Sequence, residues 1–201
     1  MDKAAIHKAI KRKFHLSNLT TRTMNLPYCA GQRYSRTHLA ELFGDLGLNK
    51  GAEIGVRAGG YSVRICNRNP SVKMFCIDPW SALGTKYPQE RQDFIYSRAI
   101  KNLAKFNVTF IRKTSMDAVG DFKDESLDFV YIDGNHNFDF VMVDIIEWSK
   151  KVRKNGIVAV HDFYGGEVGV QKAVEAYAHC HHIDPWYATK ELAPTAFWVK
   201  P

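Results

Sequence analysis

The sequence predicts an open α/β sheet in which parallel strands alternate with helices. The chain has 201 residues, of which 45% are hydrophobic and 24% are charged, so it can bury one sizeable core. Short apolar runs that end in a turn or an acid alternate with amphipathic stretches along most of its length. Strict alternation of strand and helix requires crossovers between parallel strands, and we therefore expect a doubly wound sheet.

The expected elements begin with a helix near the N-terminus and end with two short strands. Ile6, Ile10 and Phe14 recur every four residues, which predicts a basic amphipathic helix over residues 3–14. Residues 15–34 show no sustained period, and we expect a linker or strap there. The remaining expected elements are helices over 36–46, 61–67, 89–106 and 138–152, strands over 51–56, 72–78, 108–112, 127–133, 156–162, 183–189 and 195–200, and two helical turns before the last two strands.

The formal net charge of +7 belongs to the N-terminal segment. Residues 1–36 hold eight Lys or Arg and one acid, whereas the rest of the chain is balanced. We therefore expect a basic N-terminal arm or lid over residues 1–35 and a separate domain over residues 36–201. The arm could contact nucleic acid or a second copy of the chain, so a nucleic-acid partner and a homodimer stay open.

Cysteine usage and hydropathy indicate the compartment. Cys29, Cys66, Cys76 and Cys180 form no CxxC pair, and the N-terminus lacks the apolar segment of a secretion signal. We expect reduced thiols and a cytoplasmic location. The apolar runs are strand-sized, and no membrane span is expected.

The ends of the predicted strands carry the residues most suggestive of chemistry, because ligands of doubly wound sheets bind beyond the carboxyl ends of strands. The first strand runs into a glycine turn with Glu53, Gly55, Gly59, Gly60 and Ser62. Glycines let the backbone approach a ligand closely, and an acid beside them can hold a cationic or hydroxyl-bearing group. The spacing matches neither a dinucleotide fingerprint nor a phosphate-binding P-loop, which makes NAD and ATP less favoured ligands.

Asp78 ends the second strand, 23 residues after Gly55. At that distance one βαβ unit returns an acid to a ribose, so the two features together suggest an adenosine-containing cofactor. Each feature alone also fits a structural role, as a tight connection or a strand terminus.

Two further strands end in acids. Asp133 is followed by Gly-Asn-His136, and Asp162 follows His161. Two carboxylates at neighbouring strand ends would repel unless a cation joined them, and oxygen ligands suit Mg²⁺. The alternative is a pair of acids that cap loops. His136 could accept a proton near neutral pH or could be a surface histidine.

These motifs, in this order, resemble class I S-adenosylmethionine-dependent methyltransferases, and within them the small O-methyltransferases of the catechol type and their sugar- and macrolide-modifying relatives. The resemblance covers about residues 36–200 and also includes Asn155-Gly156 before the fifth strand. It implies a Rossmann-like, mostly parallel seven-stranded sheet with an antiparallel last strand, and makes residues 36–201 the methyltransferase domain.

The resemblance also implies roles for individual residues. The metal-dependent members carry an Asn directly after the second Asp, where this chain has Phe163, so Asn137 or His161 would have to replace it if a metal binds. The implied roles are: Gly55, Gly59, Glu53, Gly60 and Ser62 around the methionine part of the cofactor, Asp78 at the ribose, Ser115, Met116 and Asp117 at the adenine, Asp133 at the cofactor and the reacting groups, Asp133 and Asp162 on the metal, and His136 as the catalytic base.

We therefore expect an S-adenosylmethionine-dependent O-methyltransferase, assisted by a divalent cation such as Mg²⁺, that acts on a hydroxyl of a sugar, phenol or natural product. One alternative is an RNA methyltransferase that uses the basic arm, although the Asn/Asp-Pro-Pro-Tyr/Phe and Pro-Cys motifs and the lysine of ribose methyltransferases are missing from the expected positions. The other is a non-catalytic S-adenosylmethionine-binding module, which would leave Asp133, His136 and Asp162 unexplained.

Overall fold

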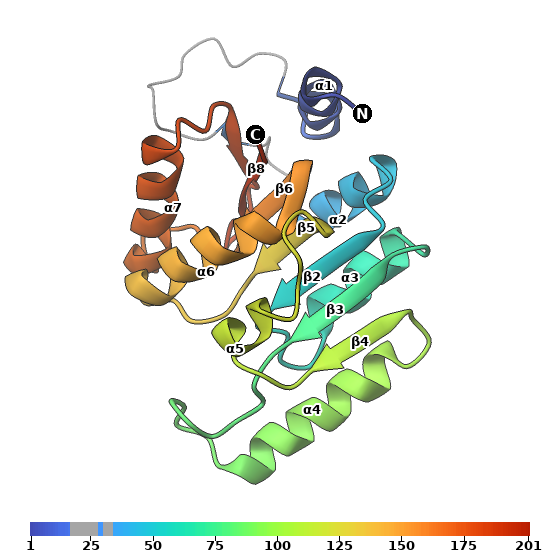
Figure 1. Ribbon diagram of the computed structural model, residues 1–201, viewed down its shortest axis with the longest axis vertical. Coiled ribbons are helices and arrows are strands. Elements are labelled where there is room, and N and C mark those ends of the chain that lie inside the picture. The colour runs from blue at the N-terminus through green and yellow to red at the C-terminus, as the bar shows by residue number, and fades with distance from the viewer. Residues whose placement is uncertain (17–27, 30–33) are drawn as a thin grey trace.

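A computed structural model describes residues 1–16, 28–29 and 34–201 of the chain. Within these residues, eight strands form one sheet in the order β1-β7-β8-β6-β5-β2-β3-β4, with helices on both faces (Figure 1). The elements are α1 (Lys3–Lys13), β1 (Tyr28–Cys29), α2 (Arg36–Asp45), β2 (Lys50–Ile54), α3 (Gly60–Arg68), β3 (Lys73–Ile77), α4 (Gln89–Leu103), β4 (Val108–Ile111), α5 (Ser115–Val119), β5 (Leu127–Ile132), α6 (Phe138–Lys151), β6 (Val152–Val160), α7 (Val168–Cys180), β7 (Trp186–Ala188) and β8 (Ala196–Val199).

The strand directions confirm the predicted doubly wound sheet. Strands β2 to β6 pair in parallel, and β8 runs antiparallel to both β6 and β7. The seven expected strands are present, and the two-residue β1 is added at the edge beside β7. Strand order reverses at β2, which lies between β3 and β5, so the carboxyl ends of these strands frame a ligand-binding crevice.

Two hydrophobic clusters fill the space on either side of the sheet. On one face, Ile10 of α1, Leu39 of α2 and Ile65 of α3 pack with Tyr131 and Phe197 from the sheet. The other face is covered by α6 and α7 (Figure 1). The amphipathic pattern of α1 therefore reflects burial within the chain, since Ile6, Ile10 and Phe14 are each at most 2% exposed.

Some elements differ from the sequence-based expectation. The short helix α5 occupies a stretch expected only to border a cofactor, and the Thr114 hydroxyl caps it by accepting the Asp117 N–H at 3.2 Å. Strand β6 begins at Val152, four residues earlier than expected, and its register shifts against β5. Gly156 permits this crossing, because a Cβ there would lie 2.4 Å from the carbonyl oxygen of Asp128.

The predicted linker over residues 15–34 lies mostly outside the described residues. Among the described residues, no helix is both long and apolar enough to cross a membrane. Cys66, Cys76 and Cys180 are free thiols, and the side chain of Cys29 lies outside the described part of the chain.

The packing of α1 predicts that Ile10→Ala will lower the free energy of unfolding by about 2–4 kcal/mol, because it leaves a cavity in the cluster that joins α1 to the sheet. Lys8→Ala, on the exposed side of the same helix, should change it by less than about 0.5 kcal/mol. Urea unfolding of both variants measures the difference. Equal stability of the two variants would show that α1 does not pack on the sheet in solution.

Candidate active site

Backbone hydrogen bonds hold the carboxyl ends of the central strands side by side. The N–H groups of Gly55, Asp133 and His161 donate to the last residues of the neighbouring strands, at 2.9, 2.8 and 2.9 Å. Gly55 has a φ of +89°, and a Cβ on it would lie 2.0 Å from the carbonyl oxygen of Asp133. The glycine turn and the first acid therefore meet across the β2–β5 edge, as the parallel-sheet prediction requires.

The glycine turn leads directly into α3. Gly59 has a φ of +78° and precedes the first helical residue, Gly60. No side chain caps this helix end, so its first backbone N–H groups remain available to an acceptor. A Cβ at Gly60 would meet nothing within 4 Å, whereas one at Gly59 would come within 2.8 Å of Leu103.

Glu53 and Ser62 form a buried pair behind the turn. Glu53 is 2% exposed and Ser62 is fully buried, and the Ser62 hydroxyl donates to the Glu53 carboxylate. Burial raises the pKa of Glu53 to about 8, although the hydrogen bond from Ser62 acts against this rise. At neutral pH the Glu53 carboxyl is therefore mostly protonated and contributes little negative charge to the site.

Asp78 ties together the loops that follow β2 and β3. Its carboxylate accepts the backbone N–H groups of Arg57 at 2.9 Å and Trp80 at 2.8 Å. The indole N–H of Trp80 donates to the Arg57 carbonyl at 2.8 Å. Burial raises the pKa of Asp78, and the backbone hydrogen bonds oppose that rise. This clamp was not foreseen from the sequence, and ribose binding by Asp78 stays a prediction.

Ser115 and Met116 lie at the start of α5, with different surroundings. The Ser115 hydroxyl donates to Asp144 and accepts the indole N–H of Trp148 at 2.7 Å. Burial raises the pKa of Asp144 to about 6, with the Ser115 hydrogen bond opposing. The Ser115 side chain is thus engaged by α6, while Met116 is 39% exposed and free to border a ligand.

Asp133, His136 and Asp162 converge as the sequence predicts. Each offers one atom of a set that lies within 4.8 Å of one another. The Nε2 atom of His136 is 3.1 Å from an Asp162 carboxylate oxygen, and its Nδ1 atom is 3.3 Å from Glu167. A carboxylate oxygen thus faces each ring nitrogen, so either nitrogen can donate an N–H to an acid, and both can when the ring is protonated.

Arg36 brings positive charge to the same cluster, and His161 brings a ring N–H group. The Nδ1 atom of His161 lies 3.3 Å from Asp133 and 3.1 Å from Asp162. Arg36 Nη1 is 2.9 Å from His161 Nε2 and 4.0 Å from Asp133. Burial lowers the pKa of His161, but hydrogen bonds and the charges of Asp133 and Asp162 raise it by more. Arg36 and the ring N–H of His161 therefore reduce the repulsion between the two acids without a metal ion, whereas the sequence predicts that only a cation can join them.

Because Phe163 stands where the resemblance implies a third metal ligand, the sequence predicts that Asn137 or His161 replaces it if a metal binds. The structure groups His136 with the two acids, and His161 also lies beside both of them. Asn137 is exposed, and the Phe163 ring packs edge-on against Trp186 in the core, with the ring centroids 5.4 Å apart. In the sequence, the spacing Asp133-x-x-His136 indicates that these residues lie together. No sequence pattern indicates that Arg36, at the start of α2, joins them.

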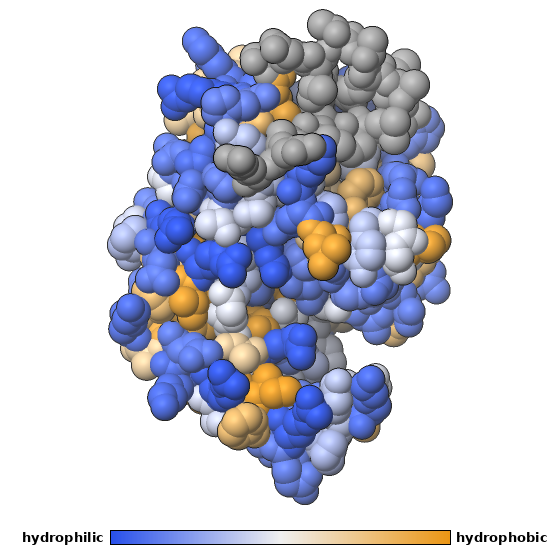
Figure 2. Space-filling view, turned by 180° about the vertical axis from the view of Figure 1, so that it is seen from behind, coloured by the Kyte–Doolittle hydropathy of each residue, from blue (hydrophilic) through white to orange (hydrophobic). Residues whose placement is uncertain are grey.

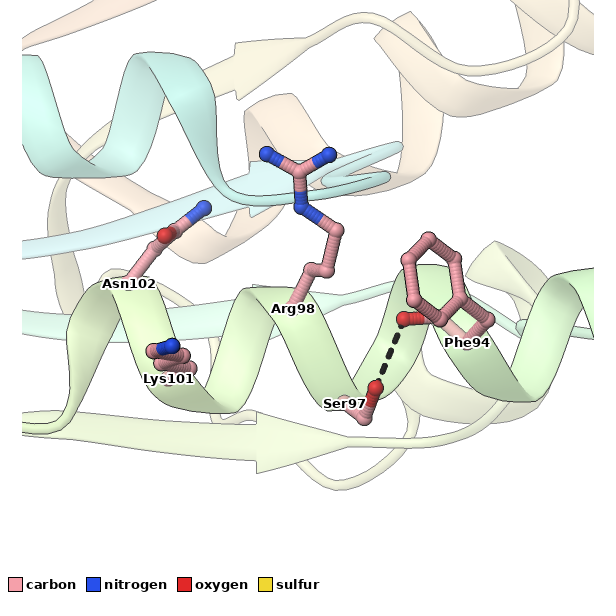
Figure 3. Close-up of a pocket in the computed structure, with 5 residues that line it drawn as sticks. All are labelled: Phe94, Ser97, Arg98, Lys101 and Asn102. Atoms are coloured by element: carbon pink, nitrogen blue, oxygen red, sulfur yellow. Dashed lines mark hydrogen bonds between the residues drawn. The ribbon is translucent and has the colours of Figure 1, made fainter.

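A groove of about 500 Å³ opens beside the glycine turn and reaches Asp133. The face of the molecule in Figure 2 is mostly hydrophilic, and a notch cuts into its right-hand edge above the lowest part of the molecule. Figure 3 shows that Arg98 and Asn102 leave α4 on one side and Ser97 on the other. The groove is lined by Arg36, Glu53, Arg57, Ala58, Gly60, Tyr61, Arg64, Arg91, Phe94, Ile95, Arg98 and Asp133.

The strand order reverses at β2, where the glycine turn lies, and the sheet includes an antiparallel pair formed by the last two strands. This is the class I methyltransferase fold that the sequence motifs predict. A family model described as a methyltransferase domain matches residues 52–163. The chain belongs to this methyltransferase family, and the match contains the glycine turn, Asp78, Asp133, His136 and Asp162.

Similar proteins share the fold at low sequence identity. An O-methyltransferase from Bacillus cereus in complex with SAH is 14% identical, with a TM-score of 0.61 over 100% of this chain and 92% of its own. TomG, an O-methyltransferase of tomaymycin synthesis from Streptomyces achromogenes in complex with SAM, is 18% identical, with the same TM-score and coverage.

A curated relative, the uncharacterized protein y4gI of Sinorhizobium fredii, is 28% identical over 95 residues. The match covers 46% of this chain and 10% of that protein, so this chain spans only a small part of the relative's length.

The close approach at Gly55 predicts that Gly55→Ala will lower the free energy of unfolding by about 3 kcal/mol or more, because the added Cβ meets backbone that cannot turn away. Gly60→Ala is the matched control, with open space around the new methyl group, and should be neutral or stabilising. Chemical unfolding of both variants measures this. A Gly55→Ala protein as stable as Gly60→Ala would contradict the packing of the β2 and β5 ends.

Proposed function

We propose that the protein is an S-adenosylmethionine-dependent O-methyltransferase that acts on a hydroxyl of a small acceptor, with assistance from a divalent cation such as Mg²⁺. The observation that carries the proposal is the meeting of Asp133, His136 and Asp162 beside the glycine turn, in a chain of a methyltransferase family. A sugar, a phenol or a natural product is the acceptor class proposed. Residues 36–201 would form the methyltransferase domain and residues 1–35 its arm.

The sheet edge offers matching groups for each part of the cofactor. The uncapped N-terminus of α3 favours an anion, which suits the carboxylate of the methionine part beside Gly55 and Gly59. Asp78 keeps acceptor capacity on both carboxylate oxygens after its two backbone hydrogen bonds, which suits ribose hydroxyls. Met116 is exposed in the helix that follows β4, where adenine would lie.

The donor set fits a divalent cation. Two carboxylates and one imidazole nitrogen can be satisfied by one ion, and the nitrogen widens the choice from Mg²⁺ toward Mn²⁺ and similar ions. The Nε2 atom of His136 lies 3.1 Å from an Asp162 oxygen, a contact that is repulsive unless a proton or a cation lies between the two atoms. When bound by Asp133, His136 and Asp162, the cation would supply charge that makes an acceptor hydroxyl more acidic.

The chain's own residues can carry out the proton transfer. His136 can accept the hydroxyl proton at Nε2, and Glu167 at Nδ1 stabilises the resulting imidazolium. The acceptor oxygen then forms a bond to the methyl carbon while the carbon–sulfur bond breaks, which gives a methyl ether and S-adenosylhomocysteine. Positioning by the strand ends is the main contribution to this step. His136 cannot be base and ligand through Nε2 at once, so where His136 is the base, Asp133 and Asp162 alone would hold the ion.

Calorimetry on the intact protein tests cofactor and metal separately. We expect S-adenosylhomocysteine to bind, and Mn²⁺ to bind with an affinity at least about tenfold weaker in Asp162→Asn, because one charged ligand is lost. Asp139→Asn, an exposed acid at the start of α6, is the control and should bind Mn²⁺ like the unaltered protein.

The two titrations have separate contradicting results. Failure of the intact protein to bind S-adenosylhomocysteine would overturn the methyltransferase proposal. Binding of S-adenosylhomocysteine with no binding of Mn²⁺ or Mg²⁺ would overturn the metal and leave His136 as the base.

A further inference from the structure

The groove carries more positive charge than its own acids balance. Five arginines line it, against two acids, Glu53 and Asp133. Arg36 contacts the acid cluster, but the other four make no salt bridge with any residue that the structure describes. These four arginines, called the arginine wall, are Arg57, Arg64, Arg91 and Arg98.

Three members of the arginine wall are held in place by contacts other than salt bridges. The Arg91 guanidinium stacks over the Tyr87 ring, 4.0 Å from its centroid. Arg64 Nη1 donates to the Thr37 hydroxyl at 3.1 Å. The backbone of Arg57 is fixed by the clamp at Asp78, and that carboxylate is the acid whose charge acts on Arg57.

The helix α4 presents two of the arginines from one face. Arg91, Ile95 and Arg98 are spaced four and three residues apart, so they share a face of α4. Asn102, one turn further on, donates to the Ala58 carbonyl at 2.9 Å and docks this face onto the glycine turn. Figure 3 shows Arg98 and Asn102 leaving the helix together. Both arginines therefore face the groove that reaches Asp133.

We propose that the acceptor is a phosphorylated small molecule, whose phosphate is bound by the arginine wall while its hydroxyl reaches the Asp133 end of the groove. The proposal rests on the proposed function and names the substrate class of that site. Guanidinium groups bind phosphate oxygens in pairs, and a dianion relieves repulsion between neighbouring arginines. The single carboxylate of the cofactor would neutralise only a small part of the positive charge of the four arginines. The groove, which would also receive the methionine part of the cofactor, has a volume of about 500 Å³, within the range of small-molecule sites.

Calorimetric titration of the intact protein with ribose 5-phosphate tests the arginine wall, with ribose as the unphosphorylated comparison and a single-stranded RNA oligonucleotide as the other phosphate source. Each titration is run with and without S-adenosylhomocysteine. We expect ribose 5-phosphate to bind and ribose not to bind. The double variant Arg91→Gln with Arg98→Gln should weaken binding of ribose 5-phosphate at least about tenfold, because two charged donors are lost.

The matched control is Lys101→Gln with Lys105→Gln, which removes the same charge from exposed positions outside the groove and should change the affinity less than about twofold. Thermal unfolding confirms that both double variants remain folded. A decrease in the affinity for ribose 5-phosphate on addition of salt would further support a contact with the phosphate.

The proposal is overturned if ribose 5-phosphate does not bind, or binds the arginine variant as tightly as the control. It is also overturned if only the RNA binds and loses affinity in the arginine variant, since the wall would then serve a nucleic acid. If the intact protein binds ribose 5-phosphate but does not bind S-adenosylhomocysteine, the result contradicts the proposed function and leaves the phosphate site standing.

Discussion

The site depends on backbone hydrogen bonds that continue the sheet one residue beyond its central strands. Gly55, Asp133 and His161 each donate an N–H group to the neighbouring strand, and so the residues that follow β2, β5 and β6 share one edge. An unpaired buried N–H would cost about 1–3 kcal/mol, which resists any slip in register. The glycine turn and the acid cluster consequently keep one relative position before any ligand arrives.

The electrostatics of the acid cluster follow from this placement. Asp133 and Asp162 lie close together because the strands require it, and Arg36 and His161 compensate part of their charge. A cation would therefore have to compete with protons and with a guanidinium, which is a stronger demand than filling an empty pair of carboxylates. Glu167 behind His136 completes a chain of contacts that can hold an imidazolium or orient a ligand.

The sequence predicted the sheet and the cluster because both depend on local patterns. Apolar runs that end in acids located the strand ends, and the parallel topology then brought Asp133, His136 and Asp162 together. The clamp that Asp78 and Trp80 form on Arg57 could not be predicted in this way, because it joins loops about twenty residues apart through side chain and backbone contacts. The Ser115 hydroxyl likewise turns toward α6, which periodicity cannot indicate.

The arginine wall illustrates the same limit. Spacing along α4 could have placed Arg91 and Arg98 on one face, but only the docking of Asn102 onto the glycine turn shows which face meets the groove.

The central claim is that the glycine turn and the acid cluster form one active site. A crystal structure with S-adenosylhomocysteine tests it most directly. The account predicts the methionine part beside Gly55 and Gly59, the ribose at Asp78, and the sulfur atom facing Asp133, His136 and Asp162. A cofactor bound with its sulfur turned away from that cluster would contradict the account.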